Sequence, residues 1–346
     1  MKYALVFLLL LVVALSVVLW HQKDALMLKE RGSFYVGGES VEQDFVELGG
    51  FRAADTVTIN QMYVEYMTPF GKPETPVVLV HGAGLSGACY DTTPDGRTGW
   101  FDYFVHKGFP TYLVDQVGRA RSGFNQAIFN NVGAGRVSPE KQPKILRMAD
   151  MHSSWINFRI GTAKGVPFPD TQFPVEAVSN LSKMSIADLS ASLSSPNPNY
   201  KTLAELTEKL NGAVIIGHSQ SGHYPLESAL IAPDKVKGMV LLEPGTCVPR
   251  PYSDEQIATF AKIPLMIMFG DHLEGSTEGA PITWQQRFEQ CNALIDRVNQ
   301  AGGKAQMVHL PEKGMRGNTH MLMQDKNNLA VADRIIDWIK RNVGRK

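Results

Sequence analysis

The stretch AVIIGHSQSGHYP, residues 213–225, constrains the fold more than any other part of the chain. Four apolar residues, typical of a strand buried on both faces, lead into GHSQSG and then into a helical pattern. A serine in so tight a strand-to-helix turn needs small residues two positions before and two positions after it. Gly217 and Ser221 meet this requirement around Ser219, although the second position is more often glycine. The stretch is interpreted either as a structural turn or, as we favour, as an elbow that exposes a nucleophile.

The remainder of the chain alternates between strand and helix patterns. Apolar and β-branched runs predict strands at 41–51, 56–69, 75–84, 110–124, 213–217, 236–245, 262–272 and 305–311. Helical patterns cover 102–109, 202–212, 223–233, 287–303 and 327–343. Such alternation implies an α/β fold, with a mostly parallel central sheet and helices on both of its faces. We expect a single domain that spans residues 41–346.

One long segment interrupts this alternation. Residues 125–200 are rich in proline, serine and asparagine and carry scattered aromatic residues. The segment is too long for an ordinary connection within a compact domain. It follows the fourth strand and precedes the strand of the elbow, so we interpret it as an inserted cap over the strand ends.

The N-terminal segment differs in kind from the rest. Lys2 precedes an uncharged apolar run from Tyr3 to Trp20, which is the pattern of a secretory signal peptide or of an uncleaved signal anchor. We therefore assign residues 1–22 to a leader. A cleaved leader predicts a secreted or periplasmic protein. An uncleaved one, whose run is borderline in length for a membrane span, predicts a membrane-anchored protein that faces outside.

Charge and cysteine content argue against several kinds of partner. Lysine and arginine together number 34, as do aspartate and glutamate, and no basic run stands out, so nucleic-acid binding has no electrostatic support. The three cysteines show no CxxC or Cys/His ligand spacing, which disfavours a structural zinc site. We expect no metal and no organic cofactor. The sequence leaves open whether the chain forms a homodimer.

A serine nucleophile requires a base, because its hydroxyl group is weakly nucleophilic at neutral pH. Where such an elbow carries a triad, the order along the chain is serine, acid, histidine. Of the histidines after Ser219, His223 lies in the adjacent helix, His272 follows a strand-end turn and His309 lies inside the last strand. His320 lies in the loop KGMRGNTHMLMQD beyond that strand, where a base can reach over the strand ends. We therefore predict His320 as the base.

Two carboxylates are candidates for the acid that would orient the histidine. Glu243 ends the strand MVLLEPG, and Asp271 ends the strand IMFGDH. In most triads on this kind of sheet the acid follows the later strand, which favours Asp271. Geometry alone permits either residue, because neighbouring strand ends converge on the same histidine.

The segment VLVHGAGLSG, residues 78–87, is the expected oxyanion loop. A loop of small residues after this strand can turn its backbone N–H groups toward the nucleophile. We predict that the two donors are the N–H of Ala83 and the N–H of Gln220, directly after the serine. The turn GRARS, residues 118–122, occupies the position of a G-x-G-x-S loop that is frequent in such folds.

Several long motifs resemble the secreted Alcaligenes-type esterases of the α/β-hydrolase superfamily. They are HGAGLSGACYDTTPDGRTGWFDYFVHKGFPTYLVDQVGRARS, DTQFPV, HSQSGHYP, EPGTC, FGDH and GNTHMLMQDKNN. The resemblance runs from about Thr75 to the C-terminus and implies a glutamate as the acid, which is Glu243 here. It assigns Asp271 to orienting the histidine loop, and the oxyanion donors to Ala83 and Gln220.

The resemblance also bears on the cysteines. It implies a disulfide between Cys247 and Cys291, which leaves Cys89 free. One departure is that relatives can carry two bridged cysteines directly after the HG pair, where this chain has Ala83 and Gly84. That rigid link is absent here, although donation from a backbone N–H does not require cysteine.

Together these features predict a secreted serine hydrolase that cleaves small-molecule carboxylic esters through an acyl-enzyme. A lactonase would run the same reaction on a cyclic ester and stays an alternative. A non-catalytic binding protein of this fold would usually have lost a triad residue, and none is lost here. Epoxide hydrolases and haloalkane dehalogenases of this fold carry an aspartate at the elbow, so Ser219 argues against both.

Overall fold

The computed structural model describes residues 25–146, 151–275, 277, 279 and 281–344. The predicted leader, residues 1–22, lies outside the described residues. Within the described part, no helix combines the length and the apolar character needed to cross a membrane.

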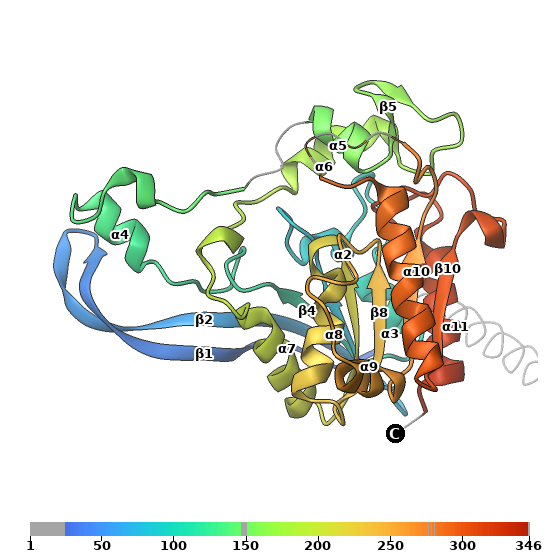
Figure 1. The fold of residues 1–346 in the computed structure, drawn as a ribbon, viewed down its shortest axis with the longest axis horizontal. Coiled ribbons are helices and arrows are strands. Elements are labelled where there is room, and N and C mark those ends of the chain that lie inside the picture. Colours follow the sequence, from blue (N-terminus) through green and yellow to red (C-terminus); the bar gives the residue numbers. More distant parts are fainter. Residues whose placement is uncertain (1–24, 147–150, 276, 278, 280, 345–346) are drawn as a thin grey trace, which may run out of the picture.

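An eight-stranded sheet with the order β1-β2-β4-β3-β7-β8-β9-β10 forms the centre of the molecule (Figure 1). The strands from β4 to β10 in this order run parallel, and β1 and β2 are antiparallel additions at one edge. The predicted mostly parallel α/β sheet is therefore confirmed. The parallel strands are β3 Val77–Val80, β4 Thr111–Asp115, β7 Ala213–His218, β8 Val236–Leu242, β9 Leu265–Phe269 and β10 Ala305–His309.

Side chains of the parallel strands alternate between two apolar cores, one on each face of the sheet. Val77 and Leu79 belong to one core, and Val78 and Val80 belong to the other. Because both faces are covered, these strands read as continuous apolar runs rather than as polar–apolar alternation.

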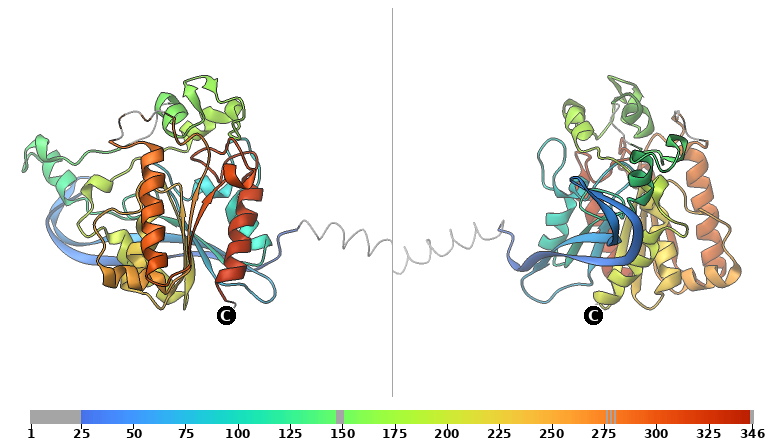
Figure 2. Two further views of the ribbon diagram at one scale, coloured as in Figure 1. Left: turned by 45° about the vertical axis from the view of Figure 1, so that its right-hand side comes forward. Right: turned by 90° about the vertical axis from the view of Figure 1, so that its left-hand side faces the viewer.

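Helices cover both faces of the sheet. Figure 2 shows α10 and α11 on opposite sides of it. The first core includes residues of α3 Trp100–His106 and α11 Asn328–Asn342. The second includes residues of α7 Pro198–Lys209, α8 Tyr224–Ile231, α9 Asp254–Ala261 and α10 Trp284–Gln300. Ser253 and Thr283 cap the N-termini of α9 and α10 in reciprocal capping boxes, which explains where these helices begin.

The antiparallel edge is a long hairpin of β1 Leu28–Leu48 and β2 Phe51–Pro69, which turns at Gly49 and Gly50. Figure 1 shows that it curves away from the sheet, and its far end lies near α4 Ala127–Gly133. The strand predicted at residues 41–51 starts earlier than expected, because β1 begins at Leu28. Its first half is rich in charged residues and glycine, so the sequence gives no strand alternation there, and pairing with β2 decides the conformation.

In the described part of the segment between β4 and β7, the elements before α7 are short. They are α4, α5 Met151–Asn157, β5 Gly161–Ala163, β6 Val166–Pro167 and α6 Val178–Lys183. In Figure 1, α5, α6 and β5 lie above the carboxyl ends of the parallel strands. The remaining short elements are α2 Ala88–Asp91 and the 3₁₀ helices Pro139–Lys141, Val175–Ala177, Ser190–Ser192, Ser219–His223 and Pro311–Lys313.

Candidate active site

Ser219 lies at the sharp turn between β7 and the 3₁₀ helix that leads into α8, with a left-handed φ of 57°. A Cβ atom at Gly217 would lie 2.2 Å from the carbonyl oxygen of Ser221, so only glycine fits there. A Cβ atom at Gly222 would lie 2.5 Å from the Cα atom of Pro244. The second obligatory glycine is thus shifted by one position, and Ser221 itself is buried and accepts a hydrogen bond from the His218 N–H.

Ser219, His320 and Glu243 form a continuous chain of contacts. His320 Nε2 lies 2.9 Å from Ser219 Oγ, and His320 Nδ1 lies 3.1 Å from Glu243 Oε2. The three residues come from the ends of β7 and β8 and from the loop after β10. If Nδ1 carries the ring proton and donates it to Glu243, the lone pair of Nε2 faces the serine hydroxyl, the geometry in which an imidazole accepts a proton from serine.

Glu243 is fully buried and receives three hydrogen-bond donors. Besides His320, the Gly270 N–H and Arg159 Nη2 each lie 2.5 Å from Oε1. Burial alone would raise the pKa of Glu243, but the charge of Arg159 and the hydrogen bond from His320 overcome it and lower the pKa to about 2. The carboxylate is therefore ionised at neutral pH. The backbone of Glu243 has a left-handed φ of 46°.

The hydrogen bonds of the Asp271 carboxylate come from backbone N–H groups and not from His320. Its Oδ1 accepts a hydrogen bond of 2.8 Å from the His272 N–H, and its Oδ2 accepts one of 2.9 Å from the Gly317 N–H. Its own N–H donates to the carbonyl oxygen of Asn318. Asp271 thus binds the loop that leads to His320, and the carboxylate next to the imidazole is that of Glu243.

The loop of His320 is fixed from several directions. The backbone N–H of His320 donates to the carbonyl oxygen of Phe158, and the carbonyl oxygen of His320 lies 2.8 Å from His218 Nε2. The buried carboxylate of Asp325 accepts hydrogen bonds from the N–H and hydroxyl groups of Thr319. Burial lowers the pKa of His320 below its ordinary value, and the charges of Arg159 and Arg287 add to this while Glu243 opposes it.

The loop after β3 passes directly beside the serine. A Cβ atom at Gly82 would lie 2.8 Å from the Cβ of Ser219, and Ala83 follows in the chain. Gln220 is tied to this loop by a buried ion pair: Arg119 Nη2 lies 2.8 Å both from Gln220 Oε1 and from Asp188 Oδ1.

This ion pair also reaches the backbone of the loop. Asp188 Oδ2 accepts a hydrogen bond from the Gly84 N–H. Arg119 belongs to the GRARS turn, so that turn supports the two segments that carry the predicted oxyanion donors.

A cavity of about 250 Å³ opens onto the serine and the histidine. It is lined by Asn157, Phe158, Ser219, Gln220, Gly245, Thr277, Trp284, Arg287 and His320. A larger cavity of about 460 Å³ lies between the β1–β2 hairpin and α7–α8, and none of the predicted site residues lines it. We therefore place the candidate site in the smaller cavity.

Sequence reasoning missed three residues of this site: Arg159, Trp284 and Arg287. Arg159 stands alone in the apolar run INFRIG, and nothing in that pattern points to a glutamate far along the chain. Its Nε also donates to the carbonyl oxygen of Asp271, at 2.7 Å. The guanidinium carbons of both arginines lie 4.7 Å from the Trp284 ring centre, and that ring lies 4.4 Å from the His320 ring.

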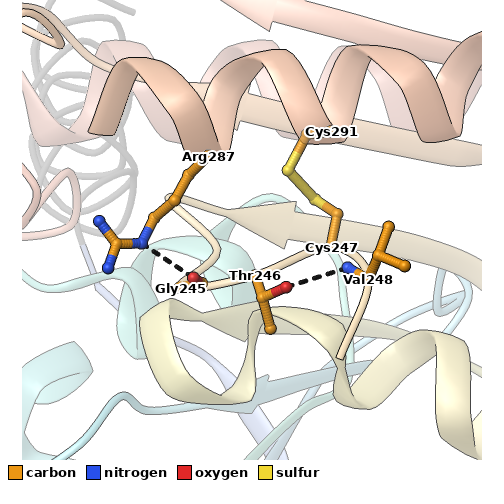
Figure 3. Close-up of a disulfide and its surroundings, with 6 residues drawn as sticks. All are labelled: Gly245, Thr246, Cys247, Val248, Arg287 and Cys291. Carbon is orange, nitrogen blue, oxygen red and sulfur yellow. Dashed lines mark hydrogen bonds between the residues drawn. A yellow bond between two sulfur atoms is a disulfide. The ribbon is translucent and has the colours of Figure 1, made fainter. Parts of the chain in front are cut away.

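A disulfide between Cys247 and Cys291 joins the loop after β8 to α10 (Figure 3). The predicted pairing is confirmed, and Cys89 is a buried free thiol. In the same close-up, Arg287 reaches from α10 to the carbonyl oxygen of Gly245. The disulfide and this hydrogen bond fix α10 against the loop that follows Glu243.

Among the described residues, one group of side chains could offer ligands to a metal ion. Ligand atoms of Asp170, Asp271 and His272 lie within 4.8 Å of one another. They are already engaged, since His272 Nε2 lies 2.9 Å from Asp170 Oδ1 and the His272 ring stacks on Phe168. The group joins the 125–200 segment to the loop after β9, and nothing else indicates a metal there.

Comparison with known proteins identifies the family of the chain. Residues 77–309 match the model of the alpha/beta hydrolase family. The chain belongs to the alpha/beta hydrolase family. The structure of a bacterial esterase is 41% identical in sequence, with a TM-score of 0.86 over 93% of this chain and 98% of that one. A probable secreted lipase, phiG, from a fungal species is 26% identical over 81% of this chain and 86% of its own length. The predicted resemblance to esterases of this superfamily is confirmed.

Proposed function

We propose that this carboxylic ester hydrolase acts through Ser219 as the nucleophile, His320 as the general base and Glu243 as the acid that orients the histidine. The observation that carries the proposal is the placement of His320, with Nε2 2.9 Å from Ser219 Oγ and Nδ1 3.1 Å from Glu243. The hydrolase family match and the esterase-like structure support the reaction class.

The reaction proceeds in two steps. Ser219 Oγ attacks the ester carbonyl carbon while His320 Nε2 takes its proton, and the imidazolium then protonates the departing alcohol. Water, deprotonated by His320, attacks the acyl-enzyme and releases the acid. The N–H groups of Ala83 and Gln220 stabilise the oxyanion in both steps. Glu243 stabilises the imidazolium, and Arg159 keeps that carboxylate ionised and in place.

The segment 125–200 serves as the cap of this site within a single hydrolase domain. Two observations support the assignment. Asn157 and Phe158 line the cavity, and Arg159 pairs with Glu243. The cap therefore completes the site as well as covering it.

We assign residues 1–22 to export of the enzyme. The Cys247–Cys291 disulfide fits an oxidising compartment outside the cytoplasm, and the fungal relative is named a secreted lipase. Mass spectrometry of the protein from its native host separates the two forms: a mature N-terminus after the leader indicates secretion, and an intact leader indicates a membrane anchor.

The test of the nucleophile combines covalent labelling and turnover. Wild type should react with a fluorophosphonate probe and hydrolyse p-nitrophenyl acetate, whereas Ser219→Ala should do neither. Ser33→Ala, on the exposed face of β1, is the matched control and should behave as wild type. Equal labelling of wild type and Ser219→Ala would contradict the assignment.

A further inference from the structure

The cavity beside Ser219 contains a positive charge that the reaction itself does not require. Arg287, in the first turn of α10, lines this cavity together with Ser219 and His320 and is half-buried there. An arginine stays protonated in proteins, so it presents a permanent cation to whatever enters.

The hydrogen bonds that Arg287 makes to described residues go to neutral acceptors. Its Nε donates to the carbonyl oxygen of Gly245 at 2.9 Å, and its Nη1 donates to that of Ile282 at 2.7 Å. Among the residues that the structure describes, no carboxylate oxygen lies within 4 Å of its nitrogen atoms. Both partners are neutral carbonyl oxygens, and within the described part of the chain Nη2 donates no hydrogen bond.

The other two arginines near the site behave differently. Arg159 pairs with Glu243 at 2.5 Å, and Arg119 pairs with Asp188 at 2.8 Å. Each of these cations is neutralised by a buried carboxylate. Among the described residues that line the cavity, Arg287 therefore carries a positive charge with no carboxylate partner, and a neutral His320 adds no charge. Burial lowers the pKa of Arg287, and the nearby charge of Arg159 acts in the same direction, as expected of a cation without an anionic neighbour.

The guanidinium is also held in place before any substrate binds. Figure 3 shows Arg287 directed toward Gly245, one helical turn before the cysteine of α10 that forms the disulfide. Its guanidinium carbon lies 4.7 Å from the centre of the Trp284 ring. Because the side chain of Arg287 is already held in place, it loses little conformational entropy when an anion binds. Little of the interaction energy is therefore offset by this loss.

We propose that Arg287 is the binding site for an ionised carboxylate of the substrate, so that the preferred substrates are esters that carry a second, anionic acid group. This inference rests on the proposed function, since it places the carboxylate next to the Ser219 nucleophile. A planar guanidinium with free N–H groups suits a carboxylate, to which it can donate two parallel hydrogen bonds. Monoesters of short dicarboxylic acids and acetylated hydroxy acids both have this chemistry.

A purely structural role for Arg287 makes a different prediction. Arg287 donates to the carbonyl oxygen of Gly245, and the N–H of Gly245 in turn donates to the carbonyl oxygen of Ser219. Arg287 could therefore support the backbone around the serine. If that were its only role, replacing it would slow every ester to the same extent. The ratio of activities on anionic and neutral esters separates the two roles.

The experiment uses two matched pairs of esters, assayed by pH-stat. Monomethyl succinate and dimethyl succinate differ in charge on the acyl side, and acetoxyacetate and 2-methoxyethyl acetate differ on the alcohol side. Wild type should favour the anionic member of at least one pair. Arg287→Met should lower kcat/KM for that ester by about 10- to 150-fold, the range expected for charged hydrogen bonds, and the neutral ester by far less.

Two further variants complete the design. Arg287→Lys keeps the charge and should recover part of the preference, which also covers the case in which Arg287→Met does not fold. Arg297→Met removes an equal charge from an outer position of α10 and should leave the preference unchanged. Added salt should weaken the preference of wild type.

The outcomes are distinct. An equal loss on anionic and neutral esters in Arg287→Met, or a wild-type preference for the neutral member of both pairs, overturns the inference and leaves the proposed function standing. If wild type cleaves none of the four esters and does not cleave p-nitrophenyl acetate, the proposed function is contradicted. The inference is then contradicted as well.

Discussion

Glu243 and Asp271 follow the carboxyl ends of the neighbouring parallel strands β8 and β9, yet their surroundings differ. Glu243 is fully buried between Arg159 and the imidazole of His320. Asp271 is partly exposed, and both of its oxygens accept hydrogen bonds from backbone N–H groups. The comparison teaches that a carboxylate at a strand end is not a catalytic acid by position alone, because its hydrogen-bond donors decide what it can hold.

The largest effect should come from exchanging each carboxylate for its amide. Glu243→Gln should lower kcat by about 10⁴-fold, as loss of the orienting carboxylate does in other triads. Asp271→Asn should lower kcat far less, since His320 keeps its partner. Steady-state kinetics on p-nitrophenyl acetate measures both. A greater loss in the aspartate variant would transfer the role of acid to Asp271.

The next effect concerns the stability of the buried ion pair. Arg159→Met leaves the Glu243 carboxylate buried without its cation and should reduce the free energy of unfolding by about 3–5 kcal/mol. The double variant Arg159→Met/Glu243→Gln should regain part of this loss, because no charge is left unpaired. Urea denaturation of the two single variants and the double variant checks the prediction. Additive losses would show that the pair is not coupled.

A smaller effect is expected for the stability of Asp271→Asn. The amide can accept from only one of the two N–H groups that the carboxylate now satisfies, those of His272 and Gly317. The other donor loses its acceptor, at a cost of about 1–3 kcal/mol. Hydrogen exchange should show faster opening of the loop at Gly317 than in wild type. Unchanged protection there would contradict the role of Asp271 as the support of this loop.

The smallest effect is a shift in pH dependence. The base must be neutral, and burial lowers the pKa of His320, so the acid limb of kcat/KM in wild type should lie below the ordinary histidine pKa of about 6.5. Arg159 lowers this pKa, so Arg159→Met should move the limb to higher pH. Glu243 raises it, so the residual activity of Glu243→Gln should have its limb at lower pH. Asp271→Asn should leave the limb in place, and a shift as large as that of Arg159→Met would count against the comparison.

Much of the candidate site could be placed from the sequence, because the carboxyl ends of parallel strands lie together at one end of the sheet. Ser219 follows a buried strand within a motif that leaves room for little but small residues. Glu243 follows the next strand in the sheet, and His320 lies in the loop beyond the last one. Short-range patterns are enough to locate such residues, because each depends on its own strand and turn.

The tertiary structure alone decided the contacts between segments. The strand patterns left Glu243 and Asp271 open as acids, and the answer depends on which carboxylate the imidazole meets. Arg159 and Arg287 carry no local signal, because an isolated arginine in a helix or an apolar run looks the same with or without a partner. The early start of β1 likewise depends on pairing with β2. The sequence by itself determined the fold class and the strand ends that carry the serine, the acid and the histidine, since these depend on short-range packing. Which charges meet at the site depends on residues far apart in the chain, and only the folded structure brings those together.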